Sequence, residues 1–278
     1  METIINGFKT NRAFAVTSVL VLCLLLIAIA APVIAPYDPT HAAMKDAFLE
    51  PGAQHLFGTD KLGRDCFSRV LYGARASLTG VLVLVASVFV VGTTMGVVSG
   101  YFGGKVDMVI MRISDMMISF PGMILAIAIA GIMGGSLVNA VFALTIVSWT
   151  KYARLARSMV LKVKRRDFVE AAIVNGGTSP HILWVHILPN ILPMMVITAA
   201  ADIGALMMEL AGLSFLGFGS QPPAPEWGLM LNEGRQQLQT APWLMFFPGL
   251  AIFVTVVVFN LWGDNLRDVL DPRGDVED

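Results

Sequence analysis

Long stretches without Asp, Glu, Lys or Arg recur along the chain and predict membrane-spanning helices. The four longest cover residues 13–37, 76–104, 116–150 and 236–263. About 20 helical residues cross the hydrocarbon core of a bilayer, so the third stretch is long enough for two helices joined by a turn at Gly131, Gly134 and Gly135. Residues 188–211 are apolar apart from two acids. We therefore expect an all-α membrane protein with six spans, at about 13–35, 78–99, 109–131, 136–157, 189–211 and 244–263.

The composition agrees with a surface that faces lipid. Of the 278 residues, 56% are hydrophobic and 14% are charged, whereas soluble domains carry about 25% charged residues. The net charge of −1 gives no basic field that would attract nucleic acid. Two cysteines cannot support a disulfide-built scaffold. Cys23 and Cys66 are expected at different depths and therefore unpaired, with Cys23 packed inside the first span.

The first span could instead be a cleaved signal peptide, because Lys9 and Arg12 precede it and the alanine-rich stretch 28–31 looks like a cleavage site. Its apolar stretch exceeds the usual length of about 7–15 residues and five spans follow, which favours a retained helix. With the N-terminus in the cytoplasm, most of the 19 Lys and Arg residues fall on the cytoplasmic side. This predicts cytoplasmic termini and an outer loop over 36–77.

The cytoplasmic loop over 162–188 is the most informative segment. Residues 167–175 read as a short helix that Gly176 and Gly177 would end. Thr178 or Ser179 could cap a second helix, with Pro180 in its first turn. A short amphipathic helix at the membrane surface suits the groove of a partner protein. The alternative is a solvated connector, or a helix on the headgroups whose basic run 162–166 touches anionic lipid.

The order of residues in this loop resembles the EAA loop of ABC importer permeases, with His186 at a position where the general pattern has Ile. The matching residues are Glu170, Ala171, Ala172, Gly176, His186, Ile187, Leu188 and Pro189. Similarity to the peptide and nickel branch of that family extends over residues 57–65, 72–75, 214–217, 225–228, 263–268 and 270–272. The resemblance therefore covers nearly the whole chain.

The resemblance implies one permease domain, residues 1–278, with the fold of type I ABC importers in a bacterial inner membrane. Such a chain is half of a pore, and its partners are a second permease, two cytoplasmic ATPase subunits and an outer solute-binding protein. Glu170, Ala171, Ala172, Gly176, His186 and Pro189 would couple it to the ATPase, and Glu226, Trp227 and Gly228 would face the binding protein. No GxxxxGK[ST] loop is present, so we expect no enzyme activity and no bound cofactor, with ATP used by partner subunits.

Ionisable residues inside a span are costly and commonly line a path or join helices. Asp202 lies mid-span, and Glu209 follows seven residues later, beside Met208. Acid, thioether and acid suit the path of a cation, whereas in the alternative Asp202 bonds a neighbouring helix and Glu209 sits at the interface. Arg112 and Asp115 could pair along one helix. His41 and His55 match no closed metal site and are expected in solvent.

The cargo is predicted from resemblance alone. Trp149, the stretch 152–154 and the stretch 202–204 look closer to nickel permeases, which favours nickel or a nickel chelate over dipeptides or oligopeptides. Two further classes of protein fit less well. An intramembrane serine protease using Ser214 would need a His, and the later spans contain none. A gradient-driven secondary transporter often carries repeats, and none is evident in this sequence. Trp227 and Trp243 are expected as interface anchors.

Overall fold

The computed structural model describes residues 11–270, and over this range the chain forms helices and loops with one isolated β-bridge between Thr59 and Asp65. The helices are α2 (Arg12–Ile34), α3 (Cys66–Phe102), α4 (Gly104–Ile118), α5 (Gly122–Met133), α6 (Leu137–Val163), α7 (Asp167–Val174), α8 (Ser179–His181), α9 (Leu188–Phe215), α10 (Trp227–Gly234) and α11 (Trp243–Leu270). Short turns of helix lie at Met44–Asp46, Ile182–Ile187 and Arg235–Gln237. Lys9, Asp271, Pro272 and Arg273, which entered the predictions above, lie outside the described residues.

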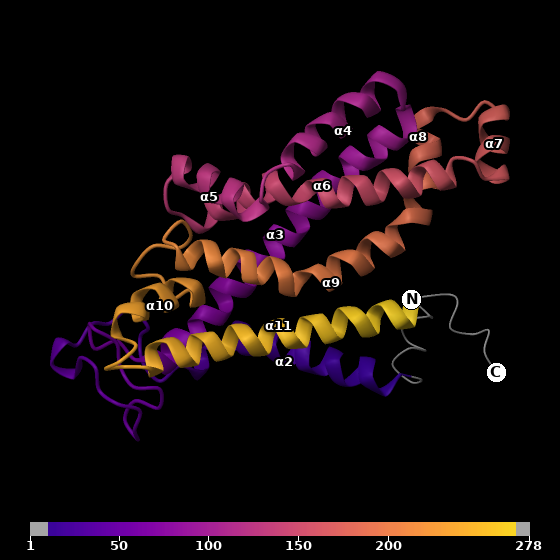
Figure 1. Ribbon diagram of the computed structural model, residues 1–278. Coiled ribbons are helices and arrows are strands. Elements are labelled where there is room, and N and C mark those ends of the chain that lie inside the picture. Colours follow the sequence, from indigo (N-terminus) through magenta and orange to yellow (C-terminus); the bar gives the residue numbers. More distant parts are fainter. Residues whose placement is uncertain (1–10, 271–278) are drawn as a thin grey trace.

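The long helices lie side by side, with different features at their two ends (Figure 1). At one end lie α7, the start of α2 and the end of α11. The loop between α2 and α3 and the short helix α10 lie at the other end. The EAA segment therefore shares an end with both termini of the described chain, as the predicted topology requires.

Four helices within residues 11–270 are long and apolar enough to cross a membrane: α2, α3, α9 with its preceding turn, and α11. A fifth span results if α4 and α5 are taken together, although they meet at 94°. The second half of α6 carries Lys151, Arg154, Arg157 and Lys162, and this helix is not among the four. The structure thus gives four to five of the six predicted spans by length and composition.

The prediction of one continuous helix over 109–131 is wrong, because two helices occupy this stretch. Its first helix begins at Gly104, ends at Ile118, and gives way to α5 after Pro121. Proline lacks the N–H that a helix needs and disfavours helical backbone in the residue before it, here Phe120. A turn at Gly134, which has φ of 85°, then leads into α6 as predicted.

Helix α3 begins twelve residues before the predicted span. Asp65 caps it, since one of its carboxylate oxygens accepts a hydrogen bond from the Ser68 backbone N–H at 2.7 Å. The first turns of α3 carry Arg69 and Arg75. These charges interrupt the apolar pattern, so the predicted span began too late. Part of the expected outer loop 36–77 is therefore helix.

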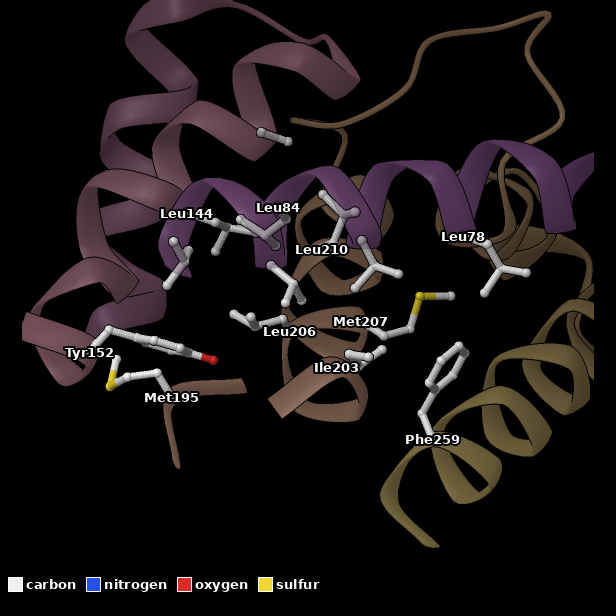
Figure 2. Close-up of a cluster of buried hydrophobic side chains, with 14 of the residues drawn as sticks. Leu78, Leu84, Leu144, Tyr152, Met195, Ile203, Leu206, Met207, Leu210 and Phe259 are labelled. Carbon is white, nitrogen blue, oxygen red and sulfur yellow. The ribbon is translucent and has the colours of Figure 1, made fainter. Parts of the chain in front are cut away.

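Close packing of α3 against α6 forms the centre of the bundle. A Cβ on Gly92 would lie 2.4 Å from the Tyr152 Cβ, and one on Gly96 would lie 2.3 Å from the Ala153 carbonyl oxygen. Glycines four residues apart thus allow the two backbones to approach, as small residues do in membrane helices. Figure 2 shows the apolar side chains that join α3, α6, α9 and α11: Leu78, Leu84, Leu144, Met195, Ile203, Leu206, Met207, Leu210 and Phe259.

Helix α2 is part of this bundle. Trp262 of α11 donates its indole N–H to the Ser18 hydroxyl oxygen at 3.1 Å, and Ala28 is buried. Cys23 is exposed, so the expectation that it packs inside the bundle is wrong, whereas Cys66 is buried at the start of α3. Both thiols are free, as predicted.

Candidate functional site

The EAA residues lie on a short helix whose outer face is free in this chain. Val169 is the buried side chain of α7 and belongs to the same apolar cluster as Ile182 and Ile187. Glu170, Ala171 and their neighbours Phe168, Ile173 and Val174 are exposed. The helix is therefore anchored on one side and presents its motif on the other.

Glycine ends α7 as the sequence predicted. Gly176 has φ of 80°, a conformation that side chains with a Cβ rarely adopt. Its N–H donates to the Ile173 carbonyl at 3.0 Å, and the N–H of Gly177 donates to the Ala172 carbonyl at 2.9 Å. These bonds satisfy carbonyls at the helix end and turn the chain sharply back toward α9.

The second helix expected after Thr178 is only three residues long. It continues through a π-helical turn, Ile182–Ile187, directly into α9. Pro189 cannot donate a backbone hydrogen bond to the preceding turn, which explains the irregular winding at this point. The predicted loop is thus one short helix packed against the irregular start of a long one.

His186 lies at the junction of these two segments. Its ring centroid is 6.3 Å from that of Phe168 on α7 and 5.7 Å from that of His181. The ring is half-buried, and the His186 carbonyl accepts a hydrogen bond from the Asn190 side chain at 2.7 Å. The structure therefore brings Glu170, Gly176, His186 and Pro189 into one hairpin-like unit.

Cations of α6, and Lys164 directly after it, join this helix to α3 and α4. Arg157 donates two hydrogen bonds to Asp107 on α4, at 2.5 and 2.6 Å, and Lys164 donates to the Tyr101 carbonyl at 2.7 Å. Arg154 binds Asp115 at 2.7 Å. The expected pairing of Arg112 with Asp115 is therefore wrong, because a cation from the neighbouring helix occupies that carboxylate.

Asp202 pairs with Lys151 across the interface between α9 and α6. The lysine Nζ lies 2.7 and 2.8 Å from the two carboxylate oxygens. Glu209 is half-buried, with Lys151 and Ser148 beside it. Met208 is exposed on another side of α9, where it borders cavities shared with α11. The expected row of Asp202, Met208 and Glu209 is therefore wrong: the two acids share one face of α9 and Met208 lies on another.

Glu226, Trp227 and Gly228 are buried, so they do not form the surface of the outer loop. The Glu226 carboxylate accepts hydrogen bonds from the N–H groups of Gly228 and Leu229, both at 2.9 Å, and thereby caps α10. The indole N–H of Trp227 donates to the Val70 carbonyl at 2.9 Å. Trp227 therefore fastens α10 to α3 and is no interface anchor.

A buried network of four charges at the same end was not predicted. Arg64 and Arg69, each 1% exposed, both contact Asp60 and Glu233, at distances from 2.6 to 3.4 Å. Burial opposes the charged form of Arg64, yet the two carboxylates outweigh it and raise the pKa of Arg64. The sequence shows only Asp60 and Arg64 four residues apart; Glu233 lies 169 positions further on.

The remaining predicted positions show no catalytic or metal arrangement. His55 contacts Asp65 at 2.9 Å and is mostly buried, which corrects the expectation of a solvated ring, whereas His41 is exposed. Within residues 11–270, no group of three His, Cys, Asp or Glu side chains could hold a metal ion. The buried Ser214 hydroxyl finds no hydrogen-bond partner in the described part, so no base accompanies it.

Comparison with known protein families identifies the class. The family described as "Binding-protein-dependent transport system inner membrane component" matches residues 92–275, and "N-terminal TM domain of oligopeptide transport permease C" matches residues 3–51. The chain therefore belongs to the inner-membrane permease family of binding-protein-dependent ABC importers. Proteins of this class are multi-pass transport subunits and not enzymes themselves, and the family implies an ATPase and a binding protein as partners.

The relatives place the chain in the dipeptide, oligopeptide and nickel branch. The dipeptide transport system permease protein DppC of Alkalihalophilus pseudofirmus is 42% identical over 95% of this chain and 87% of the relative. The nickel transport system permease protein NikC of Escherichia coli K12 is 40% identical over 96% and 97%, respectively. The glutathione transport system permease protein GsiD of Pectobacterium atrosepticum is 43% identical over 96% and 89%.

A solved structure shares the fold. Inward-facing MetNI, a methionine ABC transporter, has a chain that matches with a TM-score of 0.59 and 21% identity, covering 73% of this chain and 97% of that one. This supports the type I importer architecture. Membership of the ABC permease family also leaves no support for a gradient-driven transporter or an intramembrane protease.

Proposed function

We propose that this chain forms half of the translocation pore of an ATP-driven importer and receives the motion of the ATPase through α7. The observation that carries the proposal is the contrast within α7: Val169 holds the helix to the bundle while Glu170 and Ala171 remain exposed. A short rigid helix that is packed on one side can transmit the closure of the ATPase subunits to the bundle as rigid-body motion. Gly176 sets the angle of that knob.

The topology follows from the same proposal. Six passes would arise if α4 with α5 form one span and α6 another, with both termini and α7 in the cytoplasm. The cations of α6 have partners on α4 and α9, which makes a span with these charges tolerable. A homologous permease would complete the pore, two ATPase subunits would bind below it, and a solute-binding protein would deliver the cargo from outside.

Nickel or a nickel chelate and small peptides are the two candidate cargoes. The named relatives carry dipeptides, nickel and glutathione at nearly equal identity, so similarity does not choose between them. The observation that bears on the choice is the pairing of Asp202 with Lys151. Lys151 occupies the carboxylate that a bare divalent cation would need as a ligand, which favours a peptide cargo.

Two substitutions in the loop test the coupling role. Gly176→Pro demands φ near −65° where the chain needs 80°, and Glu170→Arg reverses a charge on the exposed face. Both variants should insert and assemble, and both should abolish the stimulation of ATPase activity by loaded binding protein in reconstituted vesicles. Normal transport by both variants would refute the assignment of the coupling loop.

A further inference from the structure

The Lys151–Asp202 pair lies halfway along two helices that the proposed topology places across the membrane. Each residue lies near the middle of its helix, α6 or α9. The lysine side chain is 63% exposed and that of the aspartate 17%. A charged pair at mid-membrane depth is too costly to face hydrocarbon and normally faces a protein partner or a water-filled path. This face of α6 and α9 therefore belongs to the inside of the assembled pore.

A third polar group, the Tyr152 hydroxyl, lies next to the Lys151–Asp202 pair. Tyr152 is 1% exposed, yet its hydroxyl has no hydrogen-bond partner among the described residues. The hydroxyl points from α6 toward α9 (Figure 2), where it lies within electrostatic reach of Asp202. A buried hydroxyl without a partner is costly, and the Asp202 carboxylate is the acceptor within its reach.

Glu209 adds a second carboxylate on the same face. It lies two turns beyond Asp202 toward the end that carries α10, with Lys151 beside it. Lys151 forms its ion pair with Asp202, and Glu209 lies within electrostatic range of both, so the three side chains together carry a net charge of −1. An incoming ammonium group is attracted to Glu209 first and to Asp202 next.

We infer that Lys151, Asp202 and Tyr152 form a transit site for a zwitterionic solute, a small peptide with free amino and carboxylate ends. Lys151 is the built-in counter-ion of the empty site. The solute ammonium replaces it at Asp202 and donates a further N–H to the Tyr152 hydroxyl oxygen, while the released Lys151 binds the solute carboxylate. Ion pairs are exchanged, so Asp202 and Lys151 each keep a partner of opposite charge.

A divalent metal does not fit the same arrangement. Nickel prefers imidazole nitrogen as a ligand. The site offers only two carboxylates, and Lys151 already occupies one of them. Within residues 11–270, no group of three potential ligands gathers here or elsewhere. The inference rests on the proposed permease function and narrows the cargo of that function.

The test measures dialanine molecules imported per ATP hydrolysed, using the whole transporter in vesicles with a saturating amount of its binding protein. Lys151→Met and Asp202→Asn should each lower this ratio about tenfold or more, because truncation leaves the other charge unpaired. The exchange Lys151→Asp/Asp202→Lys rebuilds an ion pair but puts the wrong charge beside Tyr152, and should not restore the ratio. The matched control, Arg154→Gln/Asp115→Asn, removes a similar pair one turn away and should change the ratio less than twofold.

Tyr152→Phe keeps the site measurable if the charge variants do not assemble. It removes a hydroxyl that has no partner in the empty protein, so folding should be retained, while KM for dialanine should rise about fivefold. Restoration by the exchanged pair, or an unchanged KM in Tyr152→Phe, would show that the pair is structural and overturn the inference. ATP-dependent uptake of nickel chloride without dialanine uptake would overturn the inference alone, whereas loss of all ATP-dependent uptake in the unmodified protein would refute the proposed function.

Discussion

Two helices of eight residues, α7 and α10, lie at opposite ends of the bundle, and each carries residues that the sequence analysis singled out as resembling a family motif (Figure 1). Helix α7 buries one side chain, Val169, and exposes its motif. Helix α10 buries Trp227, Gly228, Leu229 and Met230, and Glu226 caps it from inside. The exposed residues of α7 can contact a partner protein, whereas the buried residues of α10 stabilise the fold.

Breaking the charge network beneath α10 should have the largest effect. Glu233→Ala leaves Arg64 and Arg69, both 1% exposed, without one of their two acidic partners. Removing one partner of a buried pair costs about 3–5 kcal/mol. The thermal unfolding midpoint of the purified chain in detergent should therefore fall sharply. An unchanged midpoint would show that the network adds nothing to the outer end.

A smaller loss is expected from Trp227→Phe. The ring volume largely remains, but the hydrogen bond from the indole N–H to the Val70 carbonyl is lost. The lost hydrogen bond and the smaller ring together cost about 1–3 kcal/mol, although the Val70 carbonyl keeps its partner within α3. The same melting experiment should show a shift smaller than that of Glu233→Ala. A shift as large as that one would mean that α10 is held mainly by this tryptophan.

Val169→Ala tests the anchored side of α7. The substitution removes two buried carbons, worth about 1–2 kcal/mol, and should loosen the helix without unfolding the bundle. Stimulation of the ATPase by loaded binding protein should fall severalfold, and the melting midpoint should fall by less than in Glu233→Ala. Val174→Ala, at a side chain that is 86% exposed, is the control and should leave both measurements unchanged. Equal effects of the two variants would argue against a rigid, anchored knob.

The sequence predicted α2, α9, α11 and the end of α7 well, because unbroken apolar stretches and a positive-φ glycine are local signals. It missed the bend at Pro121 because an apolar residue pattern continues through it. It misassigned Glu226–Gly228 because a polar, proline-rich stretch resembles a surface loop, while the partners that bury it come from α3 and α9. The network of Arg64, Arg69 and Glu233 depends on contacts across more than 160 residues, which no local pattern reveals.

Selective protection of α7 by the ATPase is the most direct test of the central claim. Ala171→Cys, introduced with Cys23→Ser to remove the exposed native thiol, should react quickly with a maleimide in the permease alone. The second labelling position is Val174→Cys, at the end of the same helix α7. The account predicts that both thiols are labelled without the ATPase and that Ala171→Cys is strongly protected in the full complex. Equal labelling of Ala171→Cys with and without the ATPase would contradict it.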